Sequence, residues 1–420
     1  MRWLKVRRPL PKGFLRNLAI LLSVLGPGFI TANVDNDAGG IATYSMAGGW
    51  PFGYACLWTM APVLGILVLV QEMSVRMGAV TGKGLADLIR EQFGVKVTFY
   101  LMAALFVANV GNTVAEFAGI AASLELFRQS KYIVVPLAAL VVWFLVVRGT
   151  YKVVEKIFLV ACLFYVAYFI SGALAKPDWS EVAAAMFHPR IRLTADYAYM
   201  VVGIVGASVA PWMQFYLQSA IVEKGVTTQS YRLARWDAVL GAVMSCAVAF
   251  FIIVACGATI GKAGIHIDSA EQAAMALRPL AGPYCSILFA FGLFNASLFA
   301  ASILPLSTSF TICEGLGWET GVNKTFKEAP HFYGLYTAII LLGALSVLWP
   351  GLPYFRVMVF SQVLNGFLLP AVLFCMLRLI NKAELMGEFA NRRTINVIGT
   401  IVCLVLVLFN GLLVVLWMKN

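Results

Sequence analysis

Long apolar runs separated by short polar links fill the sequence from about residue 17 onward. A run of roughly 20 apolar residues is long enough to cross the hydrocarbon core of a membrane as a helix. The fold class predicted is an all-α polytopic membrane protein. We expect eleven transmembrane helices, at residues 17–47, 52–78, 97–126, 132–149, 151–174, 196–222, 236–261, 283–312, 332–350, 355–381 and 394–418, with a short amphipathic segment at 84–93.

Two of these predicted helices contain residues that interrupt a helix. The first includes "VDNDAGG", where Asn, Asp and the glycine pair Gly39–Gly40 are poor helix formers, and we expect the glycines to break it. The sixth includes "GIVGASVAPW", where Pro211 lacks a backbone N–H and frees carbonyl groups near Ala207. Freed backbone groups at membrane depth are tolerated only inside protein or beside a wet cavity. Both segments are therefore predicted to be broken helices that line a cavity.

The positions of the two breaks, in the first and sixth of eleven helices, are those expected for an inverted repeat of five helices. We predict one transport domain over residues 1–420, with repeat one at about 14–174, repeat two at about 196–381 and an additional helix at about 394–418. In folds of this kind the substrate binds between the two breaks.

Composition supports a membrane protein and excludes several other classes. The chain is 61% hydrophobic and 12% charged, and its mean hydropathy is +0.86. Most of its 31 Lys and Arg residues fall in links that are cytoplasmic if the N-terminus is inside. We place the protein in the inner membrane of a prokaryotic cell, with the N-terminus in the cytoplasm and the C-terminus outside. The net charge of +11 is spread over many links, which indicates contact with anionic lipid and not with nucleic acid.

The residues used most often in catalysis and in zinc binding form no recognisable pattern. The eight cysteines are scattered without CxxC spacing, and His188, His266 and His331 fall in or beside predicted links. No triad, phosphate loop or nucleotide fingerprint is visible in the sequence. We therefore predict a protein that is not an enzyme and that has no cofactor.

Carboxylates beside the first break indicate that the substrate is a cation. An ionised Asp37 at membrane depth is costly and usually marks an ion pathway. Together with carbonyl groups freed at the end of a half-helix, it forms an oxygen-rich site suited to a hard cation. The alternative is that Asp35 and Asp37 only cap a re-entrant turn, and Asp35 has the further alternative of facing an outer vestibule. In the tenth helix, Gln362 and Asn365 are candidates to complete the coordination, directly or through water.

Five segments carry a resemblance that extends over nearly the whole chain. They are "DAGGIAT" at 37–43, "TGKGLADLIREQFG" at 81–94, "AEFAGIA" at 115–121, "FSQVLNGFLLP" at 360–370 and "MGEFANRRTINVIG" at 386–399. With these segments the sequence resembles the Nramp family of divalent-metal transporters. The resemblance implies the LeuT-type fold, in agreement with the inverted repeat inferred above.

Departures from the family pattern concern the metal ligands. Family members hold transition metals with an Asp, an Asn and a Met sulfur, together with backbone carbonyls. Asp37 matches the Asp, whereas Gly40 replaces the Asn and Ala210 replaces the Met. The carbonyls that the resemblance implies are those of Val34 and Ala207. A larger, all-oxygen site suits Mg²⁺, which keeps several of its waters. The chain thus looks like the Nramp-related magnesium transporter branch.

Further departures fall at the positions that carry protons in family symporters, which use histidines of the sixth helix and an aspartate of the third. Trp212 and, close by, Gln218 stand at the histidine positions, and Thr113 stands at the aspartate position. None of these side chains titrates near neutral pH. Glu116 is retained, either as a proton relay or as a structural hydrogen-bonding group.

The function predicted from these residues is a secondary carrier for Mg²⁺, and also for Mn²⁺, that is not coupled to protons. The closest alternative is a proton-coupled Mn²⁺/Fe²⁺ importer of the ordinary Nramp type. A sodium-coupled carrier of an organic solute, a channel and a receptor that transports nothing are further alternatives. The expected partners are a divalent metal ion as substrate and the lipid bilayer, without nucleic acid. The sequence does not predict an oligomeric state.

Overall fold

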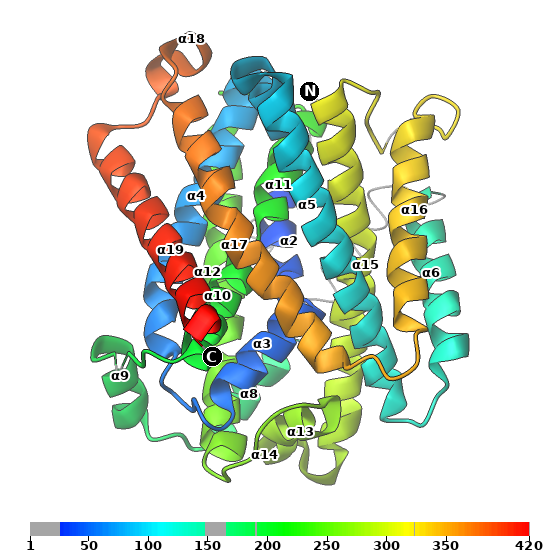
Figure 1. Cartoon of the computed structure of the whole chain (residues 1–420), viewed down its shortest axis with the longest axis vertical. Coiled ribbons are helices and arrows are strands. Elements are labelled where there is room, and N and C mark those ends of the chain that lie inside the picture. Colours follow the sequence, from blue (N-terminus) through cyan, green and yellow to red (C-terminus); the bar gives the residue numbers. More distant parts are fainter. Residues whose placement is uncertain (1–25, 148–164, 190, 323, 420) are drawn as a thin grey trace, which may run out of the picture.

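The computed structural model describes residues 26–147, 165–189, 191–322 and 324–419, and its regular elements are helices that run between two ends of the molecule (Figure 1). The longer helices are α2 (Pro27–Val34), α3 (Ala38–Gly48), α4 (Met60–Thr81), α5 (Leu85–Glu125), α6 (Lys131–Val147), α8 (Val166–Leu174), α9 (Trp179–Phe187), α10 (Ala195–Ser208), α11 (Pro211–Glu223), α12 (Tyr231–Cys256), α15 (Cys285–Leu316), α16 (Pro330–Val347), α17 (Tyr354–Ile380) and α19 (Arg393–Lys419). Short helices α13 (Ala270–Ala274), α14 (Arg278–Ala281) and α18 (Ala383–Met386) lie in the links.

Membrane-spanning helices agree with the apolar runs of the sequence. In the described ranges, eight helices are long and apolar enough to cross a membrane, and α6 is a shorter apolar helix. The broken pair α2–α3 and the helix α8 fall in the first and fifth predicted spans. Residues 17–25 of the first span and most of the fifth, up to residue 164, lie outside the described residues. The links also contain α9, α13 and α14, which the apolar pattern did not predict.

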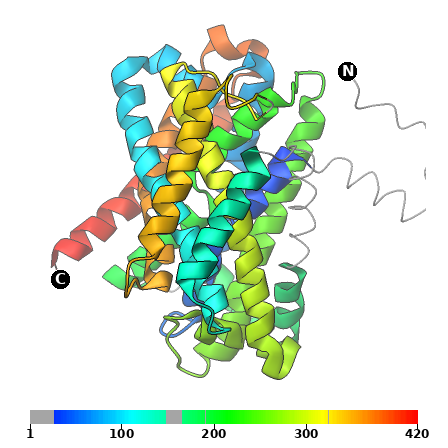
Figure 2. The ribbon, with the colours of Figure 1, turned by 90° about the vertical axis from the view of Figure 1, so that its right-hand side faces the viewer.

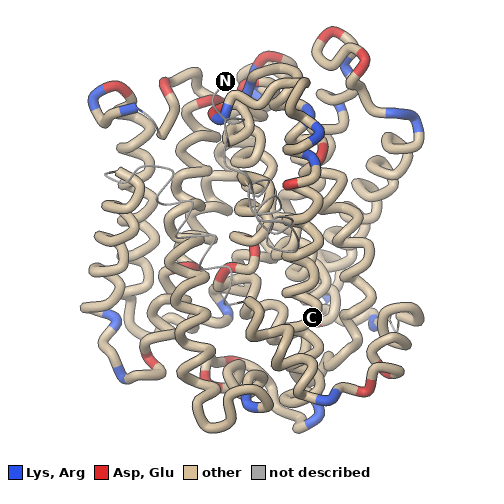
Figure 3. The backbone as a smooth tube through the Cα atoms, turned by 180° about the vertical axis from the view of Figure 1, so that it is seen from behind, with Lys and Arg blue, Asp and Glu red and all other residues tan. Residues whose placement is uncertain are grey.

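The predicted amphipathic segment is the first part of α5. At Gly94 the backbone has φ 80° and ψ 171°, which divides this helix into a short initial piece and a long span. A positive φ is readily adopted only by glycine, so this residue sets the kink. Lys and Arg gather toward the two ends of the molecule, and the middle is largely free of them (Figure 3).

Both predicted breaks are present, but the first lies earlier than the glycine pair. Residues 35–37 separate α2 from α3, and Gly39 and Gly40 lie in the first turn of α3. Asp37 is the N-cap of α3, since its side chain accepts a hydrogen bond from the Gly40 N–H at 2.6 Å. The prediction that the glycines break the helix is therefore wrong, because a capping carboxylate starts a new helix just before them. In the second break, Val209 and Ala210 separate α10 from α11, which begins at Pro211, where a missing N–H costs little.

Helices from distant parts of the chain enclose these breaks. α12 packs against α2 and α3, and α17 packs against α3, α5 and α10. α19 packs on α17 and α10 at the edge of the bundle (Figure 2), and little of it is buried. The breaks are thus surrounded by protein, as backbone freed at membrane depth requires.

The beginning of α2 is held by a side chain of α12. Asp237 is 2% exposed and accepts three backbone hydrogen bonds, from Gly26 at 2.7 Å, Gly28 at 2.8 Å and Phe29 at 3.2 Å. The N-cap residue of α2 is Gly26, which has no side chain to cap the helix. Asp237 therefore satisfies first-turn amides that a helix leaves without partners.

Candidate metal site

Asp37 is the centre of a buried polar cluster beside the first break. Its side chain is 2% exposed, and besides the Gly40 N–H it contacts the side chains of Glu116 and Gln362. Its place at the N-cap of α3 fixes the carboxylate between the two half-helices. An acidic group held at this depth by surrounding protein is suited to offset the charge of a cation.

Glu116 reaches the same cluster from α5. One of its oxygens, Oε2, accepts a hydrogen bond from the Ala38 N–H at 3.2 Å, and the side chain contacts Asp37. The other oxygen, Oε1, has no hydrogen-bond donor among the described residues. The structure therefore brings two carboxyl groups together at the start of α3.

Gln362 and Asn365 reach the cluster from α17. Gln362 Nε2 donates to Asp37 Oδ1 at 3.4 Å, and Asn365 Nδ2 donates to Gln362 Oε1 at 2.9 Å. Gly39 makes this approach possible, because a Cβ atom there would lie 1.9 Å from Gln362 Nε2. Asn365 is paired in turn with Asn112 of α5 by two hydrogen bonds, of 3.0 and 3.1 Å. These amides and Glu116 form the polar wall opposite the first break.

The other candidates of the first break lie on its α2 side. Val34 is the last residue of α2, so its carbonyl belongs to the turn that has no helical donors. Asp35 is 1% exposed, and its Oδ2 has no hydrogen-bond donor among the described residues. A buried oxygen in this condition favours the site over the alternative of an exposed vestibule. Asn36 holds the break in place. Its side-chain Nδ2 donates to Ser245 Oγ at 3.3 Å, and its backbone carbonyl accepts from the Tyr165 hydroxyl at 2.8 Å.

The second break contributes backbone and small side chains. Ala207 and Ala210 are fully buried. Gly206 packs directly on α17, since a Cβ atom there would lie 1.9 Å from the Gln362 carbonyl oxygen. A hydrogen bond of 2.8 Å between the Tyr44 hydroxyl and Ser208 Oγ joins α3 to the last residue of α10. Gln362 thus touches one break with its side chain and the other with its backbone.

Three residues at predicted coupling positions make contacts elsewhere. The Thr113 hydroxyl donates to the Asn109 carbonyl at 2.8 Å, and its methyl group lies toward Gly343 of α16. Gln218 donates to the Lys83 carbonyl at 2.9 Å, near the end of α11. Trp212 is buried in the first turn of α11, where its carbonyl accepts from Ser307 at 3.3 Å. Of the four coupling positions, only Glu116 has a described contact with Asp37.

The sequence predicts a larger metal site where Gly40 replaces the family's Asn, but the backbone beside Gly40 leaves no additional space. A Cβ atom on Gly40 would lie 2.5 Å from the Asp35 carbonyl oxygen. The space that an Asn side chain would need at this position is therefore occupied by the bend of the first break.

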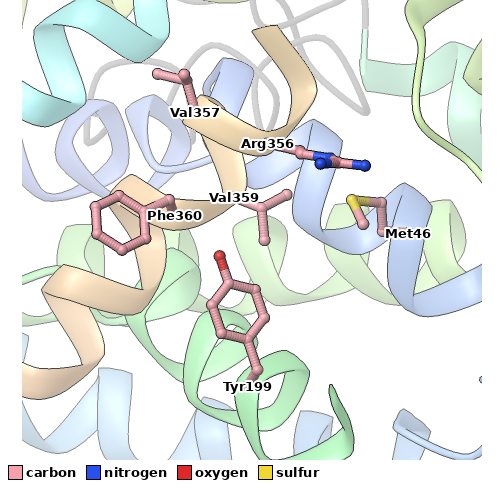
Figure 4. Close-up of a pocket in the computed structure, with 6 residues that line it drawn as sticks. All are labelled: Met46, Tyr199, Arg356, Val357, Val359 and Phe360. Atoms are coloured by element: carbon pink, nitrogen blue, oxygen red, sulfur yellow. The ribbon is translucent and has the colours of Figure 1, made fainter. Parts of the chain in front are cut away.

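A cavity of about 460 Å³ lies where α3 ends and where α10 and α17 begin, which is the outer side in the predicted topology (Figure 4). Its lining is Met46, Tyr199, Arg356, Val357, Val359 and Phe360. In the view of Figure 4 the Tyr199 hydroxyl points toward Val359, and Arg356 extends beside Met46. The same three elements carry Asp37, the second break and Gln362. The cavity itself is lined by none of the candidate site residues, and its one charged side chain is Arg356.

Asn112 and Gly39 have roles in the cluster that the sequence alone did not reveal. Asn112 lies one helical turn before Glu116 on α5, so a spacing of four residues places both on one face. Gly39 was assigned to a break, whereas it serves a close approach between helices. The described residues contain no group of three or more His, Cys, Asp or Glu arranged to hold a metal.

Sequence comparisons identify the family of this chain, and solved structures agree with its fold. A family model described as "Natural resistance-associated macrophage protein-like" matches residues 28–416. The divalent metal cation transporter MntH of Deinococcus radiodurans is 28% identical over 420 residues, covering 97% of this chain and 91% of its own. The manganese transporter of Eremococcus coleocola has a similar structure, with a TM-score of 0.78, 22% identity and coverage of 96% of this chain and 88% of that one. MhsT, solved with L-phenylalanine, has a TM-score of 0.59 at 16% identity, covering 91% of this chain and 98% of its own.

Proposed function

The chain belongs to the Nramp family, and on this premise we propose that it is a secondary carrier that moves Mg²⁺, and also Mn²⁺, across the membrane without moving protons. The family and the related transporters support transport of a divalent cation. The choice of Mg²⁺ and the absence of proton coupling are inferred from the residues around the breaks.

The chemistry of the groups around Asp37 carries this proposal. Its described contacts are a backbone N–H, the Glu116 carboxyl group and the Gln362 amide. At the second break, Ala210 stands where a sulfur ligand is expected in the family, and it offers no ligand atom in its side chain. Oxygen ligands suit Mg²⁺, whereas thioether sulfur favours softer transition metals.

Transport in this proposal follows from the two breaks. A cation that keeps part of its water shell enters between them, where Asp37 offsets its charge and carbonyl groups of Val34 and Ala207 replace lost waters. Gln362 and Asp35 complete the shell, directly or through water. Rocking of one group of helices against the other then exposes the same site to the opposite side.

One observation favours the proton-coupled alternative. Asp37 and Glu116 are two carboxyl groups in contact, and such groups repel each other unless one of them carries a proton. A divalent cation that binds Asp37 would displace that proton, and the Oε1 atom of Glu116, which lacks a donor, is placed to receive or pass it.

A flux assay in proteoliposomes separates the two functions. The purified protein is reconstituted with a pH reporter inside, and uptake of Mg²⁺, Mn²⁺ and Ca²⁺ is compared. We expect saturable Mg²⁺ and Mn²⁺ uptake with no acidification of the lumen. Acidification in proportion to uptake that disappears in Glu116→Gln would establish the coupled alternative, and the absence of Mg²⁺ flux beside active Mn²⁺ flux would overturn the proposed substrate.

A further inference from the structure

Three side-chain amides form a continuous chain that leads away from Asp37. Gln362 donates to Asp37, Asn365 donates to Gln362, and Asn365 and Asn112 exchange hydrogen bonds in both directions. All three amides are at most 1% exposed. Water therefore does not compete for their donors and acceptors, and the orientation of each amide depends on its neighbours.

The present direction of this chain is suited to a site without a cation. Gln362 turns its NH₂ group toward the Asp37 carboxylate, and its oxygen faces Asn365. A carboxylate without a cation is stabilised by a hydrogen-bond donor in this way. A bound cation needs the opposite arrangement, in which the oxygen of Gln362 faces the site.

Reversal of the whole chain keeps its internal hydrogen bonds. The two ends of a primary amide have nearly the same shape, and they differ in donating or accepting. If all three amides turn over together, Asn365 accepts from Gln362, and the two bonds between Asn365 and Asn112 form again with donor and acceptor exchanged. Turning Gln362 alone would instead place two NH₂ groups against each other at the position of the 2.9 Å bond.

We propose that Asn365 and Asn112 are positioning residues that set the direction of the Gln362 amide, and that all three amides reverse together when a cation binds at Asp37. This inference rests on the proposed function, since it concerns the same site. Binding supplies the driving force, because a cation makes a Gln362 oxygen favourable beside the Asp37 carboxylate. Asn112 touches neither Asp37 nor the cation, so its effect on affinity passes through Gln362.

The test is a double-mutant cycle between Asn112 and Gln362, which have no described contact with each other. KM and Vmax for Mg²⁺ uptake are measured in proteoliposomes for Asn112→Leu, Gln362→Leu and the double variant. We expect KM to rise about fivefold in Asn112→Leu and about tenfold in Gln362→Leu, with Vmax nearly unchanged. In the double variant we expect KM to equal that of Gln362→Leu, because nothing remains for Asn112 to orient.

Asn109→Leu is the matched control. Asn109 is a fully buried amide of the same helix, and its side-chain atoms have no hydrogen-bond partner among the described residues. We expect this variant to keep the KM of the parent. If Asn112→Leu does not fold, Asn112→Asp replaces it, since an isosteric carboxylate accepts from Asn365 but cannot donate. We expect Asn112→Asp to raise KM about threefold, again only when Gln362 is present.

Independent effects, in which KM of the double variant rises by the product of the single changes, would overturn the positioning role. An unchanged KM in both Asn112 variants would overturn it as well. If the parent carries Mn²⁺ and not Mg²⁺, the proposed substrate fails, and the same cycle is measured with Mn²⁺. The two hypotheses therefore fail in different measurements.

Discussion

The two helix breaks hold repeat-related positions, but their chemistry differs. The break between α2 and α3 contains Asp35, Asn36 and Asp37 and faces Glu116, whereas the break between α10 and α11 contains only Val209 and Ala210. The first break therefore carries charged and polar side chains, and the second carries only apolar ones. This difference separates the strength of cation binding from the choice of cation, since substitutions at each break are expected to change mainly one of them.

Removal of the charge at the first break should have the largest effect. We expect Asp37→Ala to lower divalent-cation uptake about 100-fold or more. A cation at membrane depth would lose the carboxylate at the start of α3 that offsets its charge. Uptake in proteoliposomes measures the loss, and gel filtration checks folding. Asp178→Ala is the control, because Asp178 caps the short link helix α9 and is exposed. Near-normal uptake by folded Asp37→Ala would exclude this residue as a metal ligand.

Glycines pack both breaks against α17, with different consequences. A Cβ atom on Gly206 would collide with the backbone of α17. It would lie 1.9 Å from the backbone carbonyl oxygen of Gln362 and 2.5 Å from the backbone nitrogen of Gly366. We expect Gly206→Ala to lower the free energy of unfolding by about 1–3 kcal/mol, as overpacking does. Gly39→Ala collides with the end of the flexible Gln362 side chain, so we expect a higher KM and little loss of stability.

Thermal unfolding in detergent distinguishes these two glycine variants. Gly203→Ala is the control, since its Cβ atom would come no closer than 3.3 Å to Val363. If Gly39→Ala unfolds at a lower temperature than Gly206→Ala, the assignment of side-chain contact to one break and backbone contact to the other is wrong.

The choice of cation should depend on the second break. We expect Ala210→Met to raise the preference for Mn²⁺ over Mg²⁺ about tenfold, because thioether sulfur is a softer ligand. Ala210→Leu adds similar volume without sulfur and should leave the ratio of the two uptakes unchanged. Equal ratios in the Met and Leu variants would show that sulfur does not set selectivity here. Gly40→Asn is not combined with this change, since its Cβ atom would clash with the Asp35 carbonyl.

The smallest effect is expected at the hydrogen bond that joins α3 to α10. Tyr44→Phe removes a bond of 2.8 Å to Ser208. A neutral buried hydrogen bond contributes about 1 kcal/mol, so we expect uptake to fall about fivefold or less. Ser208→Ala should have a similar effect, and the double variant should be no worse than either single one. Additive losses would mean that the two side chains act separately.

Much of the fold could be predicted from the sequence, because transmembrane helices depend on the length and polarity of local runs. The breaks were also predictable, since Pro211 and the run of Asp and Asn disfavour a continuous helix. The exact position of the first break was not predicted, because Asp37 caps α3 and the helix begins before the two glycines. The capping bond from the Gly40 N–H to Asp37 is local. The packing of Gly39 against Gln362 of α17, which accompanies it, depends on tertiary structure.

The site residues that the sequence singled out come from separate helices, and only the packing of those helices reveals which of them lie together. Asp37, Glu116 and Gln362 lie together, but their roles in transport remain predictions. Thr113 was placed by its position in a motif, and only the packing of α5 against α16 reveals that it faces Gly343. Asn112 was missed for the same reason, since its partner Asn365 is 253 residues away in the sequence.

The capping of α2 by Asp237 has a consequence for biosynthesis. Gly26 and Asp237 are separated by 211 positions, so at ordinary rates of translation the cap is made roughly 10 to 40 s after the helix it holds. During this interval five further predicted spans are made, and the first amides of α2 have no protein acceptor on α12. The first half-helix can therefore take its final place only when the second repeat arrives. With a cysteine introduced in place of Ala32 in α2, a ribosome-bound chain that stops before residue 237 should be labelled there by thiol reagents, and a chain extended through α12 should be protected.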